Sequence, residues 1–76
     1  MSEPVILDAK GLKCPLPVLK ARKAMREVPE GGVLRVIATD PGAVKDFEHF
    51  CKTTGHVLVA SRDEGNTFVF DIRKTA

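Results

Sequence analysis

Residues 5–28 contain the signals for a strand, a turn and a helix, in the order VILDAKGLKCPLPVLKARKAMREV. The short apolar run at residues 5–7 is rich in β-branched side chains and predicts a strand. We expect this strand to end near Asp8, before a turn at Gly11. A strand that leads directly into a helix is typical of a connection that crosses over a sheet.

The predicted helix begins at Pro15, because the fixed φ of proline suits the first helical position. Cys14 is therefore predicted at the N-cap. Apolar residues recur at helical spacing on a stripe centred on Val18, with Ala24 beside it, and this stripe comprises Val18, Ala21, Met25 and Val28. Pro29 and the glycines at 31 and 32 are expected to end the helix.

The rest of the chain continues this alternation. Residues 33–38 predict a central strand, apolar enough to be buried on both faces. Asp40 is the predicted N-cap of a second helix, which Gly55 ends. The apolar face of this helix comprises Ala43, Val44, Phe47, Phe50, Cys51 and Thr54. Residues 56–60 and 67–72 predict a hairpin with its turn at residues 63–66.

The resulting β-α-β-α-β-β order predicts an α+β fold, a two-layer α/β sandwich. Two helices should cover one face of a four-stranded mixed sheet. The chain has 76 residues, and we expect residues 1–76 to form one domain. No apolar run approaches the ~18 residues needed to cross a bilayer, and residues 1–4 lack a secretion signal. We therefore expect a cytoplasmic protein that does not enter a membrane.

Charge is distributed unevenly along the chain. Residues 10–26 contain six cations and no acid, whereas the remaining residues contain six cations and ten acids. The basic segment includes Cys14, and this coincidence is the most informative feature of the composition.

Cys14 is the candidate nucleophile. A helix N-terminus carries partial positive charge, and Lys13 and Lys10 are close in sequence, so we expect these groups to favour the reactive thiolate. Pro15 and Pro17 stiffen the backbone that presents the sulfur. The alternative interpretation is a small apolar residue that caps the helix, although Ser, Thr, Asp and Asn dominate at that position.

The other cysteine and the histidines give no comparable signal. Cys51 lies on the apolar face of the second helix and is interpreted as core packing, and no disulfide with Cys14 is expected. His49 is interpreted as a solvated helix residue, and His56 marks the junction between helix and strand. These four residues lack the paired spacing of a metal site, so no metal or other cofactor is expected. Asp8 is expected to bond to the loop backbone.

The first helix presents a basic arc, whose cations are Lys20, Arg22, Lys23 and Arg26. Leu16 and Leu19 share this arc. It has three interpretations: a solvated face, a docking surface for an acidic protein, or a nucleic-acid contact. The chain has no Trp or Tyr and its Phe residues fall in predicted core or sheet positions, which argues against direct nucleic-acid binding.

Residues 7–17, read together as LDAKGLKCPLP, resemble the D-x-x-G-x-x-C-P-x-P signature of the TusA/SirA-like family of small sulfur-carrier proteins. Asp8, Gly11, Cys14, Pro15 and Pro17 occupy the signature positions. Further similarity follows at residues 38–41, 50–51 and 55–56, so the resemblance covers essentially the whole chain. The fold that the resemblance implies has the same β-α-β-α-β-β order.

The resemblance implies a sulfurtransferase without a cofactor. Cys14 would accept sulfane sulfur as a persulfide from a donor protein, such as a cysteine desulfurase or a rhodanese-like protein. It would then pass the sulfur to a cysteine of an acceptor protein, as in tRNA 2-thiouridine synthesis or a related relay. Lys13 and the cations of the basic arc would contact these partners, and we expect a monomer.

Two other functions stay open from the residues alone. One is a non-enzymatic regulatory or nucleic-acid-binding module that uses the basic first helix. The other is a thiol redox protein, which the lack of a C-x-x-C pair at Cys14 argues against.

Overall fold

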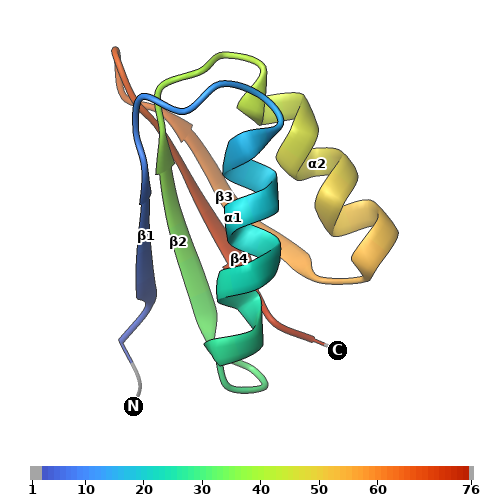
Figure 1. The fold of residues 1–76 in the computed structure, drawn as a ribbon. Helices are drawn as coiled ribbons and strands as arrows, with labels where there is room; N and C mark the ends of the chain where they lie inside the picture. Colours follow the sequence, from blue (N-terminus) through green and yellow to red (C-terminus); the bar gives the residue numbers. More distant parts are fainter. Residues whose placement is uncertain (1–2, 76) are drawn as a thin grey trace.

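The computed structural model describes residues 3–75 and contains four strands and two α-helices in the predicted order. In chain order the elements are β1 (Val5–Ala9), α1 (Leu16–Ala24), the 3₁₀ turn η1 (Met25–Glu27), β2 (Val33–Ala38), α2 (Ala43–Thr54), β3 (Val57–Asp63) and β4 (Phe68–Arg73). The sheet has the order β1-β2-β4-β3. Both helices lie on one face of this sheet (Figure 1), which confirms the predicted two-layer architecture.

The sheet is mixed, as predicted. β1 runs parallel to β2, with Leu7 opposite Val36, while β4 is antiparallel to both β2 and β3. Because β1 and β2 are parallel, their carboxyl ends lie at the same edge of the sheet. The loops that lead into α1 and α2 therefore meet at that edge (Figure 1).

The prediction that β2 is buried on both faces is wrong. Its residues alternate between buried and half-buried, and the buried set consists of Leu34, Val36 and Ala38. The half-buried side chains face away from the helices, and one of them, Arg35, forms an ion pair with Asp71 of β4 at 2.8 Å. The two helices cover one face only, so a central strand of this fold is enclosed on one side.

Both helices begin later than predicted. α1 has Pro15 at its N-cap, so Cys14 precedes the cap by one residue. α2 has Gly42 at its N-cap, and Asp40 lies two residues further back in the preceding turn. The C-terminal prediction for α2 is confirmed, because Gly55 adopts φ +87° and its N–H bonds to the Cys51 carbonyl at 3.0 Å.

The stripe on α1 is buried, but Val18 is not its centre. Pro17 and Ala21 are buried within the helix, followed by Met25 and Val28, whereas Val18 is half-buried at the margin. The proline ring packs inward, so the buried face is turned by one position from the predicted one. The hairpin is confirmed, with its turn closed by a 2.8 Å bond from the Glu64 N–H to the Thr67 carbonyl.

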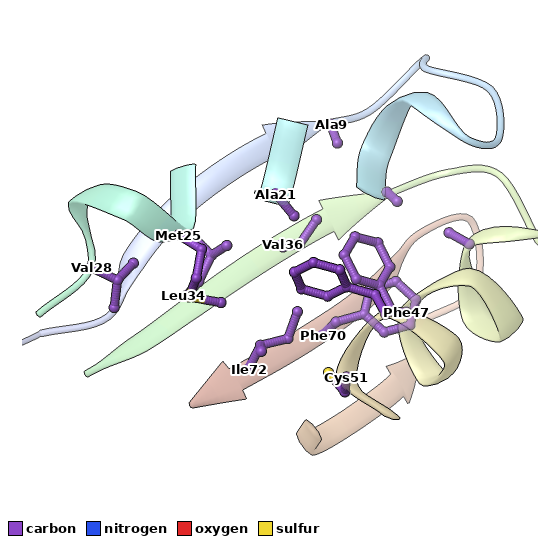
Figure 2. Packing of buried hydrophobic residues seen from close by; sticks show 13 residues of the cluster. Ala9, Ala21, Met25, Val28, Leu34, Val36, Phe47, Cys51, Phe70 and Ile72 are labelled. Carbon is purple, nitrogen blue, oxygen red and sulfur yellow. The ribbon is translucent and has the colours of Figure 1, made fainter. Parts of the chain in front are cut away.

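The core lies between the sheet and the two helices (Figure 2). At its centre the ring of Phe47 from α2 stacks on Phe70 from β4, with ring centroids 4.7 Å apart, and both side chains are fully buried. Cys51, one turn further along α2, belongs to the same cluster and is 6% exposed, as its interpretation as core packing required. This packing fixes α2 against the sheet and so fixes where its first turn lies.

Candidate functional site

Two hydrogen bonds join the loop before α1 to the loop before α2. The Gly11 N–H donates to Thr39 Oγ1 at 2.9 Å, and the Cys14 N–H donates to Asp40 Oδ2 at 2.6 Å. The segment that carries Cys14 is thereby attached to a loop 26 residues away in sequence. Gly11 has φ +82°, a conformation that L side chains rarely adopt.

Two aspartates organise these loops from within. Asp8 Oδ1 accepts a bond from the Lys10 N–H at 3.0 Å, the loop contact that the sequence predicted for this carboxylate. Asp40 accepts from the Cys14 N–H and also from the Gly42 N–H, at 3.3 Å. Asp40 does not cap α2 as predicted. Its carboxylate instead bonds to the backbone of the loop before α1 and of the loop before α2.

Cys14 is exposed, and its thiol donates a hydrogen bond to Asp46 Oδ2 on α2. The start of α2 lies directly beside it, since a Cβ added at Gly42 would be 3.4 Å from Cys14 Cβ. Cys14 is therefore exposed on one side and contacts the loop before α2 and the first turns of α2 on the other.

The expectation that the surroundings of Cys14 favour its thiolate is wrong. The hydrogen bond to Asp46 raises the pKa of the Cys14 thiol, and desolvation and the negative charges of Asp46 and Asp40 raise it further. The two carboxylates lie far from Cys14 in sequence but close to its sulfur in the fold. The thiol of this site is hydrogen-bonded to Asp46, and the carboxylates beside it disfavour the thiolate.

A groove of about 250 Å³ between α1 and α2 adjoins the thiol, because Pro15 and Asp46 are among the residues that line it. The others are Val18, Arg22, His49, Phe50 and Thr53. His49 was predicted to be a solvated helix residue, and it is exposed at the wall of this groove. The groove is open to solvent beside Pro15 and Asp46.

His56 lies past the opposite end of α2 from Cys14 and takes no part in this site. Its Nδ1 accepts a bond from the Thr75 N–H at 3.3 Å, and burial together with Lys74 lowers its pKa. Cys51 is a free thiol whose pKa is raised by burial. Within residues 3–75, no group of three His, Cys, Asp or Glu side chains is arranged to hold a metal ion.

The predicted basic arc is exposed on α1 and η1, but it divides into two sides. Arg22 and Arg26 line a second cleft, of about 190 Å³, on the side of α1 that faces α2. Lys20 and Lys23 line a hollow on the other side, together with Leu7 of β1. Only Arg22 is shared with the groove that adjoins Cys14, and its guanidinium lies 5.6 Å from the centre of the Phe50 ring.

The remaining predicted residues lie as follows. Lys13 is exposed in the loop before Cys14, and Leu16 and Leu19 are 47% and 53% exposed on α1. Pro15 is exposed and Pro17 is buried, so the two prolines of the motif contact different surroundings. Pro15 borders the groove, whereas Pro17 anchors the first turn of α1 in the core.

Asp46 is the residue that sequence reasoning missed. It is half-buried on α2, 32 residues from Cys14, and nothing in its local sequence distinguishes it from any other carboxylate in the first turns of a helix. The topology could have identified it, because parallel β1 and β2 bring the N-terminal ends of α1 and α2 to one edge.

No helix formed by residues 3–75 has the length and apolar character needed to span a membrane. The family model for "Sulfurtransferase TusA" matches residues 5–74. A sulfur carrier protein TusA of Allochromatium vinosum is 55% identical to this chain over 91% of each protein. A protein of the same name from Pseudomonas syringae pv. tomato is 46% identical, over 97% of this chain and 96% of that one.

The fold has a solved counterpart. The crystal structure of a SirA-like protein from Desulfitobacterium hafniense superposes with a TM-score of 0.80 at 23% identity and covers 95% of this chain and 99% of that chain. The match to the family model over nearly the whole sequence, together with relatives at this level of identity, shows that the chain belongs to the TusA sulfurtransferase family.

Proposed function

We propose that this protein is a sulfur carrier that holds sulfane sulfur as a persulfide on Cys14. A donor protein, such as a cysteine desulfurase or a rhodanese-like protein, supplies the sulfur, and a cysteine of an acceptor protein receives it. The observation that carries the proposal is the exposed Cys14 thiol, positioned by bonds between two loops, within the Cys-Pro-x-Pro motif of a TusA family member.

The surroundings of Cys14 suit a carrier. Sulfur passes between proteins by exchange at sulfur atoms, which requires that the carrier sulfur can reach into the partner's site. The exposed thiol of Cys14 meets this requirement, and the bond from its N–H to Asp40 limits how far its backbone can move. The buried Cys51 does not meet it.

The four other motif residues support this presentation of the sulfur. Asp8 and Gly11 shape the loop, the former through its bond to the Lys10 N–H and the latter through its positive φ. Pro15 borders the groove beside Cys14, and Pro17 anchors α1 in the core. We assign all four to positioning and none to the chemistry itself.

The test is to locate the transferred sulfur. The protein is incubated with a cysteine desulfurase and cysteine, digested without reductant, and its peptides are weighed. The peptide containing residue 14 is expected to gain the mass of one sulfur atom, and the peptide containing residue 51 is expected to stay unchanged. Sulfur found on Cys51, or on neither cysteine, would contradict the proposal.

The basic arc and Lys13 form the proposed docking surface for the acidic surfaces of these partners. Its cations are Lys13, Lys20, Arg22, Lys23 and Arg26, all exposed. Arg22 is the member that also lines the groove beside Cys14, so it is the cation best placed to contact a partner whose sulfur is reacting. The side of α1 that carries Lys20 and Lys23 faces the hollow at Leu7.

Charge reversal should show which side of the basic arc contacts the donor protein. The Arg22→Glu variant is expected to need about tenfold more donor for half-maximal loading, because a like charge at a protein interface is strongly unfavourable. Lys20→Glu makes the same change in net charge on the side of the docking surface away from the groove, and a smaller change, of about threefold or less, is expected. Loading rates against donor concentration measure both, with thermal unfolding as a check on Arg22. Equal effects of the two substitutions would show that Arg22 has no special role in donor docking.

A further inference from the structure

We propose that Asp46 is a catalytic residue of the sulfur transfer: its Oδ2 takes the proton of the Cys14 thiol when Sγ attacks a donor and returns a proton when Sγ departs. This inference rests on the proposed function of Cys14. It gives a role to a carboxylate that contacts the reacting atom itself.

The contacts of the two nearby carboxylates differ. Asp40 is occupied by the backbone N–H groups of Cys14 and Gly42, so its role is to hold the loops together. Asp46 accepts the bond from the thiol, and among the residues that the structure describes no cation lies within ion-pair distance of it. Asp46 also lines the groove, together with Pro15, the residue that follows Cys14.

A carboxylate beside the Cys14 thiol disfavours the thiolate that the reaction needs, so its presence at this site needs an explanation. Attack on a donor requires the thiolate of Cys14, and departure from the persulfide is faster when the leaving sulfur is a weaker base. Asp46 and Asp40 raise the pKa of the thiol, so by charge alone they slow both steps. The direct bond from Sγ to Asp46 offers a compensating route, because the proton can transfer to the carboxylate during attack and back during departure.

The loading step balances with these groups. Sγ of Cys14 forms a bond to the outer sulfur of a donor persulfide, and the sulfur–sulfur bond of the donor breaks. The electron pair of that bond goes to the donor cysteine, which is reduced to a thiol, while Cys14 is oxidised from a thiol to a persulfide. The thiol proton passes to Asp46 and then to the departing donor sulfur. In delivery, the attacking acceptor thiol gives its proton to Asp46, which passes it to the departing Sγ, so no other oxidant, reductant or proton source is needed.

Asp46→Asn separates the electrostatic effect from proton transfer. The charged groups that face Cys14 are Asp46 on α2 and Asp40 on the preceding loop, and the variant removes one of these charges. Its thiol should react faster with iodoacetamide at pH 7, by about threefold to tenfold, with the pH profile moved to lower pH. Loading from glutathione persulfide should instead become slower, by about 10²-fold.

Two further variants control for charge and for structure. Glu48→Gln removes one exposed carboxylate from the same helix and is expected to change neither rate. Asp46→Glu restores a carboxylate and should recover part of the loading rate, which a purely structural role of the residue would not predict. Circular dichroism checks that each variant is folded.

The outcomes distinguish this inference from the proposed function. Faster alkylation with slower loading in Asp46→Asn supports proton transfer by Asp46. If loading by that variant equals or exceeds that of the natural protein, Asp46 only suppresses the thiolate and the inference is wrong. An unchanged alkylation profile would show that the thiol and Asp46 do not interact in solution. If the natural protein forms no persulfide on Cys14, the proposed function itself fails.

Discussion

Replacing Cys14 by serine is expected to abolish sulfur loading and delivery completely, while the fold and its stability stay close to those of the natural protein. A serine oxygen cannot form the persulfide, so no residual route through this residue exists. The side chain at position 14 is exposed and precedes α1, so its replacement removes no core contact. Surface substitutions of this kind usually change stability by less than about 0.5 kcal/mol.

Cys51 provides the matched control. Cys51→Ser puts a hydroxyl into a cluster where the side chain is 6% exposed, so a loss of about 1–3 kcal/mol in stability is expected. Loading, measured by intact mass after incubation with a cysteine desulfurase, should be retained in this variant. Thermal unfolding of both variants completes the comparison. Persistent loading of Cys14→Ser, or complete loss of loading in a folded Cys51→Ser, would show that the sulfur is carried elsewhere.

The architecture could be predicted because each element carries its own local signal. The β-branched run that opens β1, the apolar face of α2 and the turn residues between β3 and β4 each indicate one structure only. The number of strands and the helices between them then leave few topologies. Local signals do not show whether one face of a strand or both faces will be buried. β2 is apolar enough for two buried faces, but only the face toward the helices is covered.

The chemistry of Cys14 could be predicted only in part. Its exposure and its place in the motif follow from residues 8–17, where the stiff prolines and the turn at Gly11 are adjacent in sequence. Its pKa does not follow, because the carboxylates that raise it come from Asp40 and Asp46, far along the chain. Expectations based on neighbours in sequence counted Lys10 and Lys13, which are not among the groups that shift the thiol.

The basic arc shows a similar limit. Helical spacing correctly placed its cations on the exposed side of α1. It could not show that α2 lies along one flank of that arc, so that Arg22 borders the groove beside Cys14 while Lys20 faces β1. The spacing defines an angle around one helix, and the position of the second helix is set by how its apolar face packs on the sheet.

Phe47→Ala is expected to destabilise the domain by about 3–5 kcal/mol, enough to unfold much of the population at 37 °C. The Phe47 ring is fully buried, stacks on Phe70 at 4.7 Å and meets the Phe50 ring edge-on at 6.3 Å, so its removal leaves a cavity bordered by α2 and β4. Small domains have a total stability of only about 5 kcal/mol or slightly more, so a loss of this size is a large part of the whole.

Chemical denaturation measures this loss, and Leu19→Ala serves as its control. Leu19 is 53% exposed on α1, so its truncation should shift stability by about 0.5 kcal/mol or less, although both variants remove a large apolar side chain. A free energy of unfolding for Phe47→Ala within about 1 kcal/mol of that of the natural protein would contradict the packing in Figure 2. The result also bears on the site: Phe47 follows Asp46 directly in α2, so the side chain that anchors the helix in the core holds the neighbouring carboxylate against the Cys14 thiol.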